Sequence, residues 1–190
     1  MEIASGREID PSAPKPDDID IATIAHALSL QCRYNGHCRR FYSVAEHSVL
    51  VAKHLAEAGA NDLTLKWGLL HDASEAYLGD VVMDIKRRLI NYRPMEEAFE
   101  RAIASAFDID LDGVDFRVVK RADLAALMAE ARCLMPSKGE EWGIAIPPSN
   151  HAIYCWTPEQ AEIEFLTKAT QLEIITTASY LLARKAFSGT

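Results

Sequence analysis

Apolar residues recur every three to four positions along most of this chain, which is the period of an amphipathic α-helix. Between Asp20 and Leu30, for example, Ile21, Ile24 and Leu28 fall on one helical face. No run of alternating apolar and polar residues is long enough for a convincing strand. The pattern therefore predicts an all-α protein, a bundle of helices around a shared core.

Capping signals divide this pattern into separate helices. Ser43-Val44-Ala45-Glu46 has the form of a capping box, with Ser as the N-cap and Glu three residues later. Thr157-Pro158-Glu159-Gln160 repeats the signal, with Pro in the first turn. We expect helices at 20–30, 43–59, 61–79, 85–90, 93–107, 118–135, 157–172 and 179–187. We expect irregular links at 32–42, 80–84, 108–115 and 136–148.

The length of 190 residues suits a single domain with its own core. We expect this domain to span 1–190, with a polar extension at 1–18, a core at about 20–135, and a loop with C-terminal helices at 136–190. No apolar run approaches the roughly 20 residues that cross a bilayer. Residues 1–16 lack the apolar segment of a signal peptide and are not Arg-rich like a transit peptide. We therefore expect a cytoplasmic protein with no membrane partner.

The cysteine pattern gives no sign of a zinc site. Cys32, Cys38, Cys133 and Cys155 match no CxxC spacing. We expect them to be small core residues or bystanders. Their pattern fits a reducing compartment.

The charge balance is acidic, with 20 Lys and Arg against 28 Asp and Glu and a net charge of −8. This argues against a nucleic-acid partner, because nucleic acids bind through neutralisation of their phosphates. A small anionic substrate needs only a local group of cations. Taken singly, each cation is more often a solvated surface charge. The local candidates are Arg33, Arg39, Arg40, Lys86, Arg87 and Arg88.

Four residues on three expected helices are candidate metal ligands. His71-Asp72 lies late in an apolar helix, His47 lies in the first turn of the preceding helix, and Asp123 lies early in a later one. Imidazole and carboxylate groups both bind divalent transition metals. Taken singly, His47 could be a core histidine and Asp123 could pair with a surface arginine. A carboxylate entering an apolar helix face is costly unless it is paired or bound to a metal.

The order of these residues resembles a known metal-binding pattern. His47…His71-Asp72…Asp123 is similar to the ligand set of the HD-domain phosphohydrolases. The small phage dATP triphosphohydrolases share the same short architecture. The resemblance implies an HD-domain helical bundle with one divalent ion at its centre, Mn, Co, Ni, Fe or Zn, with Mg also open.

The flanking residues strengthen the resemblance. Tyr42–Ser48 resembles the segment around the first ligand in the bacterial 5′-deoxynucleotidases. Leu70–Glu75, followed by Gly79-Asp80, resembles their HDxxE…GD segment. The likeness covers roughly residues 20–135, and no motif supports the residues after about 136.

The resemblance also implies roles for residues beside the metal. Glu75 would act in proton transfer, and Asp80 would lie near the sugar and the reacting water. An alternative for Glu75 is a surface position on an amphipathic helix. Both residues are candidate catalytic groups.

Further residues are candidates for substrate binding. Arg33-Tyr34 resembles an Arg-aromatic pair in which Arg grips the phosphate and the aromatic ring discriminates against a 2′-hydroxyl. The usual aromatic residue is Trp, and here it is Tyr34. Lys86 resembles a lysine that helps to hold phosphate. His37 lies in a loop beside the basic residues and is a further candidate for contact with substrate.

Together these features predict a metal-dependent hydrolase of a small nucleotide, a 5′-(deoxy)nucleoside mono- or triphosphate. Two alternatives stay open: an HD sensor module that binds metal or nucleotide without turnover, and a helical adaptor with a coincidental His-Asp pair. Association into a homodimer or a larger homo-oligomer is also open, because the apolar last helices suit either an interface or the core.

Overall fold

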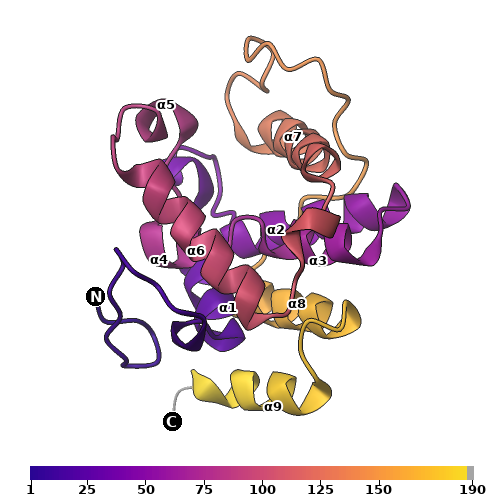
Figure 1. The fold of residues 1–190 in the computed structure, drawn as a ribbon. Helices are drawn as coiled ribbons and strands as arrows, with labels where there is room; N and C mark the ends of the chain where they lie inside the picture. Colours follow the sequence, from indigo (N-terminus) through magenta and orange to yellow (C-terminus); the bar gives the residue numbers. More distant parts are fainter. Residues whose placement is uncertain (188–190) are drawn as a thin grey trace.

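The computed structural model describes residues 1–187, and the described part is helical without a named strand, which confirms the all-α prediction (Figure 1). The predicted domain ends at residue 190, so its residues 188–190 lie outside the described part. The α-helices are α1 (Ile21–Leu30), α2 (Val44–Glu57), α3 (Asp62–Leu70), α4 (Glu75–Leu78), α5 (Met83–Lys86), α6 (Tyr92–Ala106), α7 (Phe116–Leu134), α8 (Pro158–Gln171) and α9 (Thr177–Ala186). Short 3₁₀ helices are η1 (Pro16–Asp18), η2 (Arg33–Gly36) and η3 (Leu111–Gly113).

The two predicted capping boxes have different outcomes. At α8 both halves form, because the Thr157 side chain accepts from the Gln160 N–H and the Gln160 side chain accepts from the Thr157 N–H. At α2 only the Ser43 half forms, with the Ser43 hydroxyl accepting from the Glu46 N–H at 3.1 Å. The prediction that Glu46 completes a capping box is therefore wrong, and its carboxylate has other donors.

Glu46 joins α2 to the segment that precedes α8. Its carboxylate accepts hydrogen bonds from the backbone N–H groups of Tyr154, Cys155 and Trp156 at 2.8, 3.0 and 2.7 Å. The Glu46 carboxylate binds these three N–H groups instead of the single N–H of a cap. Three charge-assisted hydrogen bonds offset the free-energy cost of burying the carboxylate.

The helix predicted at 61–79 is interrupted. α3 ends at Leu70, a turn follows at 71–74, and α4 begins at Glu75. In this turn the Ala73 N–H donates to the Leu70 carbonyl and the Glu75 N–H donates to the Asp72 carbonyl, at 2.9 and 3.0 Å. These are three-residue bonds of the tighter 3₁₀ kind. The interruption places His71 and Asp72 at the turn.

The core is built around α2. This helix packs against α1, α3, α7 and α8, and α1 also packs against α8 (Figure 1). Phe165 and Leu166 of α8 are fully buried, so α8 completes the core. The N-terminal segment also contributes, because Ile3 and Ile9 are buried against the same cluster. Within the described residues, no helix has both the length and the apolar character of a membrane span.

Candidate metal centre

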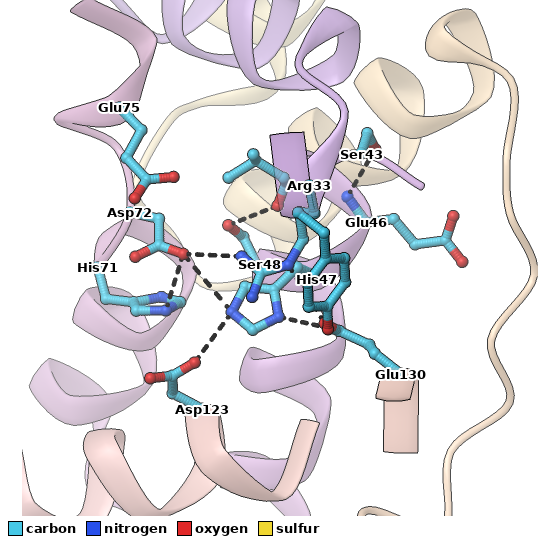
Figure 2. A network of polar contacts seen from close by, with 12 residues as sticks. Arg33, Ser43, Glu46, His47, Ser48, His71, Asp72, Glu75, Asp123 and Glu130 are labelled. Atoms are coloured by element: carbon cyan, nitrogen blue, oxygen red, sulfur yellow. Dashed lines mark hydrogen bonds and ion pairs between the residues drawn. The ribbon is translucent and has the colours of Figure 1, made fainter. Parts of the chain in front are cut away.

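Three side chains from α2 and the turn after α3 converge on one point. His47, His71 and Asp72 each offer a ligand atom, and these atoms lie within 4.8 Å of one another (Figure 2). Asp72 Oδ2 lies 3.5 Å from His47 Nε2 and 3.3 Å from His71 Nε2. The first turn of α2 and the turn after α3 thus form a group that could bind a metal ion.

The hydrogen bonds of the two histidines leave both Nε2 atoms directed into this group. The His71 Nδ1–H donates to the Gly68 carbonyl at 2.9 Å, because a carbonyl only accepts. His47 Nδ1 is paired with Glu130 Oε1 at 2.6 Å. Both Nε2 atoms are buried and make no hydrogen bond within residues 1–187. A neutral imidazole with its Nδ1 proton engaged presents Nε2 as a metal ligand, so the residues fit a metal ion.

Asp123 lies at the edge of the group. Its Oδ1 is 3.2 Å from His47 Nε2, and its Oδ2 accepts from Lys120 Nζ at 2.6 Å. Figure 2 shows Asp123 directed at the same nitrogen of His47 as Asp72, from below it in this view. α7 therefore brings a second carboxylate to His47, outside the tight group of three.

Glu130 is a site residue that the sequence reasoning missed. It is fully buried on α7, two turns after Asp123. Besides His47, it accepts hydrogen bonds from Arg33 Nε at 3.2 Å and from the Tyr34 hydroxyl at 2.7 Å. The available signal was its position seven residues after Asp123, on the same helical face, among alanine and methionine. Glu130 orients His47, as a carboxylate behind a ligating histidine does.

The carboxylates around His47 favour a positive charge at this point, which a second proton on the imidazole supplies and which a bound cation would supply in its place. Burial and Arg33 act to lower the pKa of His47, but Glu130 and Asp123 outweigh them and raise it to about 10. Burial acts to raise the pKa of Glu130, but Arg33 and His47 lower it to about 2. Burial also opposes ionisation of Asp72, whose pKa is nevertheless lowered by His71 and His47. The carboxylates thus stay ionised around the position that a cation would take.

The predicted catalytic and substrate residues, with the exception of His37, line one cavity beside these carboxylates. The cavity has a volume of about 250 Å³. Its polar lining residues are Arg33, Tyr34, Asp72, Glu75, Asp80, Lys86, Lys120 and Asp123. His37 is exposed at the end of η2 and does not line it. The fold therefore gathers residues that lie up to 90 positions apart in the chain.

A larger cavity of about 470 Å³ adjoins the first one, sharing Met83 and the charged residues Asp72, Lys86, Lys120 and Asp123. Its wall contains the aromatic rings of Trp67, Tyr92 and Phe116. Aromatic walls beside a few charged groups are typical of small-molecule sites.

Buried Glu75 and half-buried Lys86 form a pair at the cavity wall. Lys86 Nζ donates to Glu75 Oε1 at 3.1 Å and to Glu96 Oε1 at 2.8 Å. Burial, together with Asp72 and Asp80, raises the pKa of Glu75 well above its usual range. Its Oε2 is buried and has no hydrogen-bond partner in the described part of the chain. A carboxyl group whose pKa is raised in this way suits proton transfer.

The chain is similar to two bacterial proteins. "Uncharacterized protein YfdR" of Escherichia coli is 39% identical over 128 residues, which cover 67% of this chain and 68% of that protein. The chain belongs to the YfdR family. "Uncharacterized protein RCAP_rcc00048" of Rhodobacter capsulatus is 36% identical over 139 residues, covering 69% of this chain and 70% of that protein. No protein-family model matches the chain.

Proposed function

We propose that this protein is a metal-dependent phosphohydrolase acting on a small nucleotide, a 5′-(deoxy)nucleoside mono- or triphosphate. One observation carries the proposal. The two buried Nε2 atoms without hydrogen bonds, on His47 and His71, converge with Asp72 beside a cavity that also holds Arg33 and Lys86. A group of metal-binding side chains beside cationic residues and a buried acid suits the binding and hydrolysis of phosphate esters. The resemblance to HD-domain proteins supports a nucleotide as the substrate.

In this proposal His47, His71, Asp72 and Asp123 hold one divalent ion of the series Mn, Co, Ni, Fe, Zn or Mg. When bound, such an ion polarises a phosphoryl group and lowers the pKa of water. The Nε2 atoms of the two histidines and the carboxylates of the two aspartates are the donor set. Mixed nitrogen and oxygen donors suit the transition metals of the series better than Mg.

The remaining residues bind substrate and handle protons. Arg33 and Lys86 attract the phosphate, and Lys120 adds a cation at the same wall. Glu75 delivers a proton to the leaving oxygen, because its raised pKa favours the protonated form of the carboxyl group. Asp80 lines the same cavity and orients the sugar or the reacting water.

The test is hydrolysis by metal-stripped protein supplied with one metal at a time. Mn, Co, Ni, Fe, Zn and Mg are each combined with ribo- and deoxynucleoside mono- and triphosphates, and the products are separated by anion-exchange chromatography. We expect release of phosphate or triphosphate with at least one pair. His71→Ala should abolish release and metal uptake. His54→Ala should keep both, because His54 lies on α2 about two turns beyond His47 and outside the group.

A Glu75→Gln variant separates catalysis from binding. Loss of the proton donor should lower turnover by about 10²–10⁴-fold while metal content is unchanged.

One observation favours a second candidate, a binding module without turnover. Arg33 and Lys86 are already paired with buried carboxylates, Arg33 with Glu130 and Lys86 with Glu75. Stoichiometric metal and nucleotide binding with no product from any pair would select that module and contradict the hydrolase.

A further inference from the structure

Two of the four cysteines are in direct contact. Cys32 Sγ and Cys38 Sγ lie 3.5 Å apart, and Cys38 Sγ also lies 3.7 Å from the Arg33 carbonyl. Both residues are half-buried, and all four cysteines of the chain are free thiols. The two thiols are therefore close enough to react with each other and are accessible to a small molecule.

The contact closes the base of a tight loop. Tyr34 and Asn35 between the thiols both have left-handed backbone, with φ of 58° and 50°. Only a compact turn brings the two ends of this segment so close together, and two backbone bonds hold it there. The Arg33 N–H donates to the Tyr42 carbonyl at 2.9 Å, and the Arg39 N–H donates to the Leu134 carbonyl at 3.0 Å.

We propose that Cys32 and Cys38 form a thiol–disulfide site that a small disulfide, such as oxidised glutathione, oxidises. One cysteine thiolate attacks a sulfur of the small disulfide, which breaks the S–S bond and releases one small thiolate. The second cysteine loses its proton and attacks the protein sulfur of this mixed disulfide. A second small thiolate leaves, so two protein thiols and one small disulfide become one protein disulfide and two small thiols.

The geometry favours the intramolecular bond over a lasting mixed disulfide. A disulfide has a sulfur separation of about 2.0 Å, so the two sulfurs need to approach by only about 1.5 Å. Burial raises the pKa of Cys38 to about 11, and its contact with Cys32 adds to this effect. Because the thiolate is the nucleophile, oxidation should be slow at neutral pH and faster as the pH rises.

The bond would close a ring around the residues that reach the metal centre. Arg33 and Tyr34 lie inside the ring, and both donate to Glu130, which holds His47. Oxidation therefore fixes the segment in the conformation in which these contacts form. The proposal for this site is based on the cysteine geometry alone and does not depend on the proposed hydrolysis.

The test uses the full chain with Cys133→Ser and Cys155→Ser, in which the pair supplies the only thiols. After incubation with excess oxidised glutathione, we expect the titratable thiols to fall from two to zero. The intact mass should fall by about 2 Da with no added glutathione, as expected for loss of two hydrogens. Peptide mapping should show a 32–38 link that dithiothreitol reverses. Adding Cys32→Ser should leave a stable glutathione adduct on Cys38 instead.

A second measurement tests the claim that the bond fits the existing loop. The melting temperature of the oxidised Cys133→Ser/Cys155→Ser protein should exceed that of the reduced protein. Stable glutathione adducts on both cysteines, an unchanged mass, or a lower melting temperature after oxidation would each overturn the proposal.

Discussion

At the scale of single residues, the metal centre depends on a carboxylate that is not one of its ligands. Glu130 accepts hydrogen bonds from His47 Nδ1, Arg33 Nε and the Tyr34 hydroxyl, and is fully buried. A buried carboxylate without such donors would cost several kcal/mol. The bond of Glu130 with His47 Nδ1 fixes the tautomer and ring position of His47, so ligand geometry and charge balance depend on one side chain.

Glu130→Gln should weaken metal binding by about 10–100-fold, the usual effect of losing a carboxylate behind a ligating histidine. The amide is neutral. Its NH₂ group can only donate, so it would replace one of the two oxygens that accept hydrogen bonds from the neighbouring donors. Arg33 also loses its buried counter-ion. Calorimetric titration of metal-stripped protein with Mn²⁺ measures the change.

The matched control for this substitution is Glu140→Gln. Glu140 is exposed in the loop after α7, and its side chain makes no hydrogen bond or ion pair within residues 1–187. Its Mn²⁺ affinity should equal that of the wild type. Equal affinities for the two variants would show that Glu130 does not orient the centre.

At the scale of elements, the position of His71 depends on a close approach of α3 to α2. Gly68 has no side chain, and a Cβ there would overlap Leu55 Cδ1, which is fully buried. The carbonyl of Gly68 also accepts from His71 Nδ1. One glycine therefore sets both the contact between helices and the orientation of a candidate ligand.

Gly68→Ala should destabilise the fold by about 1–3 kcal/mol, because the overpacked core has little room to relax. The higher helix propensity of alanine offsets about 1 kcal/mol of the overlap. Urea unfolding measures the change in free energy. Leu55→Ala removes the overlapping atom, so the double variant should lose less stability than the sum of the single variants. Strict additivity would show that the overlap is absent.

The two predicted capping boxes show what a sequence reveals about an element. The box at Thr157 is local, and its residues alone predict it. At Glu46 the preferred donors lie 108–110 residues away, so only the folded chain brings them together. Local spacing likewise predicted the ends of α1 and α8, but not the turn at 71–74, because the apolar helical pattern continues through it.

Glu46→Gln should destabilise the protein by about 1–3 kcal/mol, because one amide oxygen replaces a charged carboxylate that accepts three N–H groups. Chemical unfolding measures the loss. Gln160→Ala removes the corresponding residue of the exposed box at α8 and should change stability by no more than about 0.5 kcal/mol. Equal effects of the two substitutions would contradict the role given to Glu46.

At the scale of the whole molecule, the periodicity of apolar residues was sufficient to predict the all-α class. His47, His71 and Asp72 could also be predicted as a group, because ligand chemistry and order are visible in the sequence. Their arrangement around Glu130 could not, because it depends on how α7 packs against α2. The same limit applies to α8, whose burial against α1 no local motif indicates.

Because the candidate ligands come from α2, the turn after α3 and, with Asp123, α7, a bound ion should stabilise the whole fold. An ion that binds only the folded chain at 100 times its Kd adds about 2.7 kcal/mol. For a protein of this size that corresponds to a rise of about 5–10 °C in Tm. Calorimetric melting of EDTA-stripped protein with and without Mn²⁺ measures the shift. Asp72→Asn should abolish it, since the amide removes the charge between the two histidines. An equal shift in Asp72→Asn, or none in the wild type, would rule out this centre as the place where the ion binds.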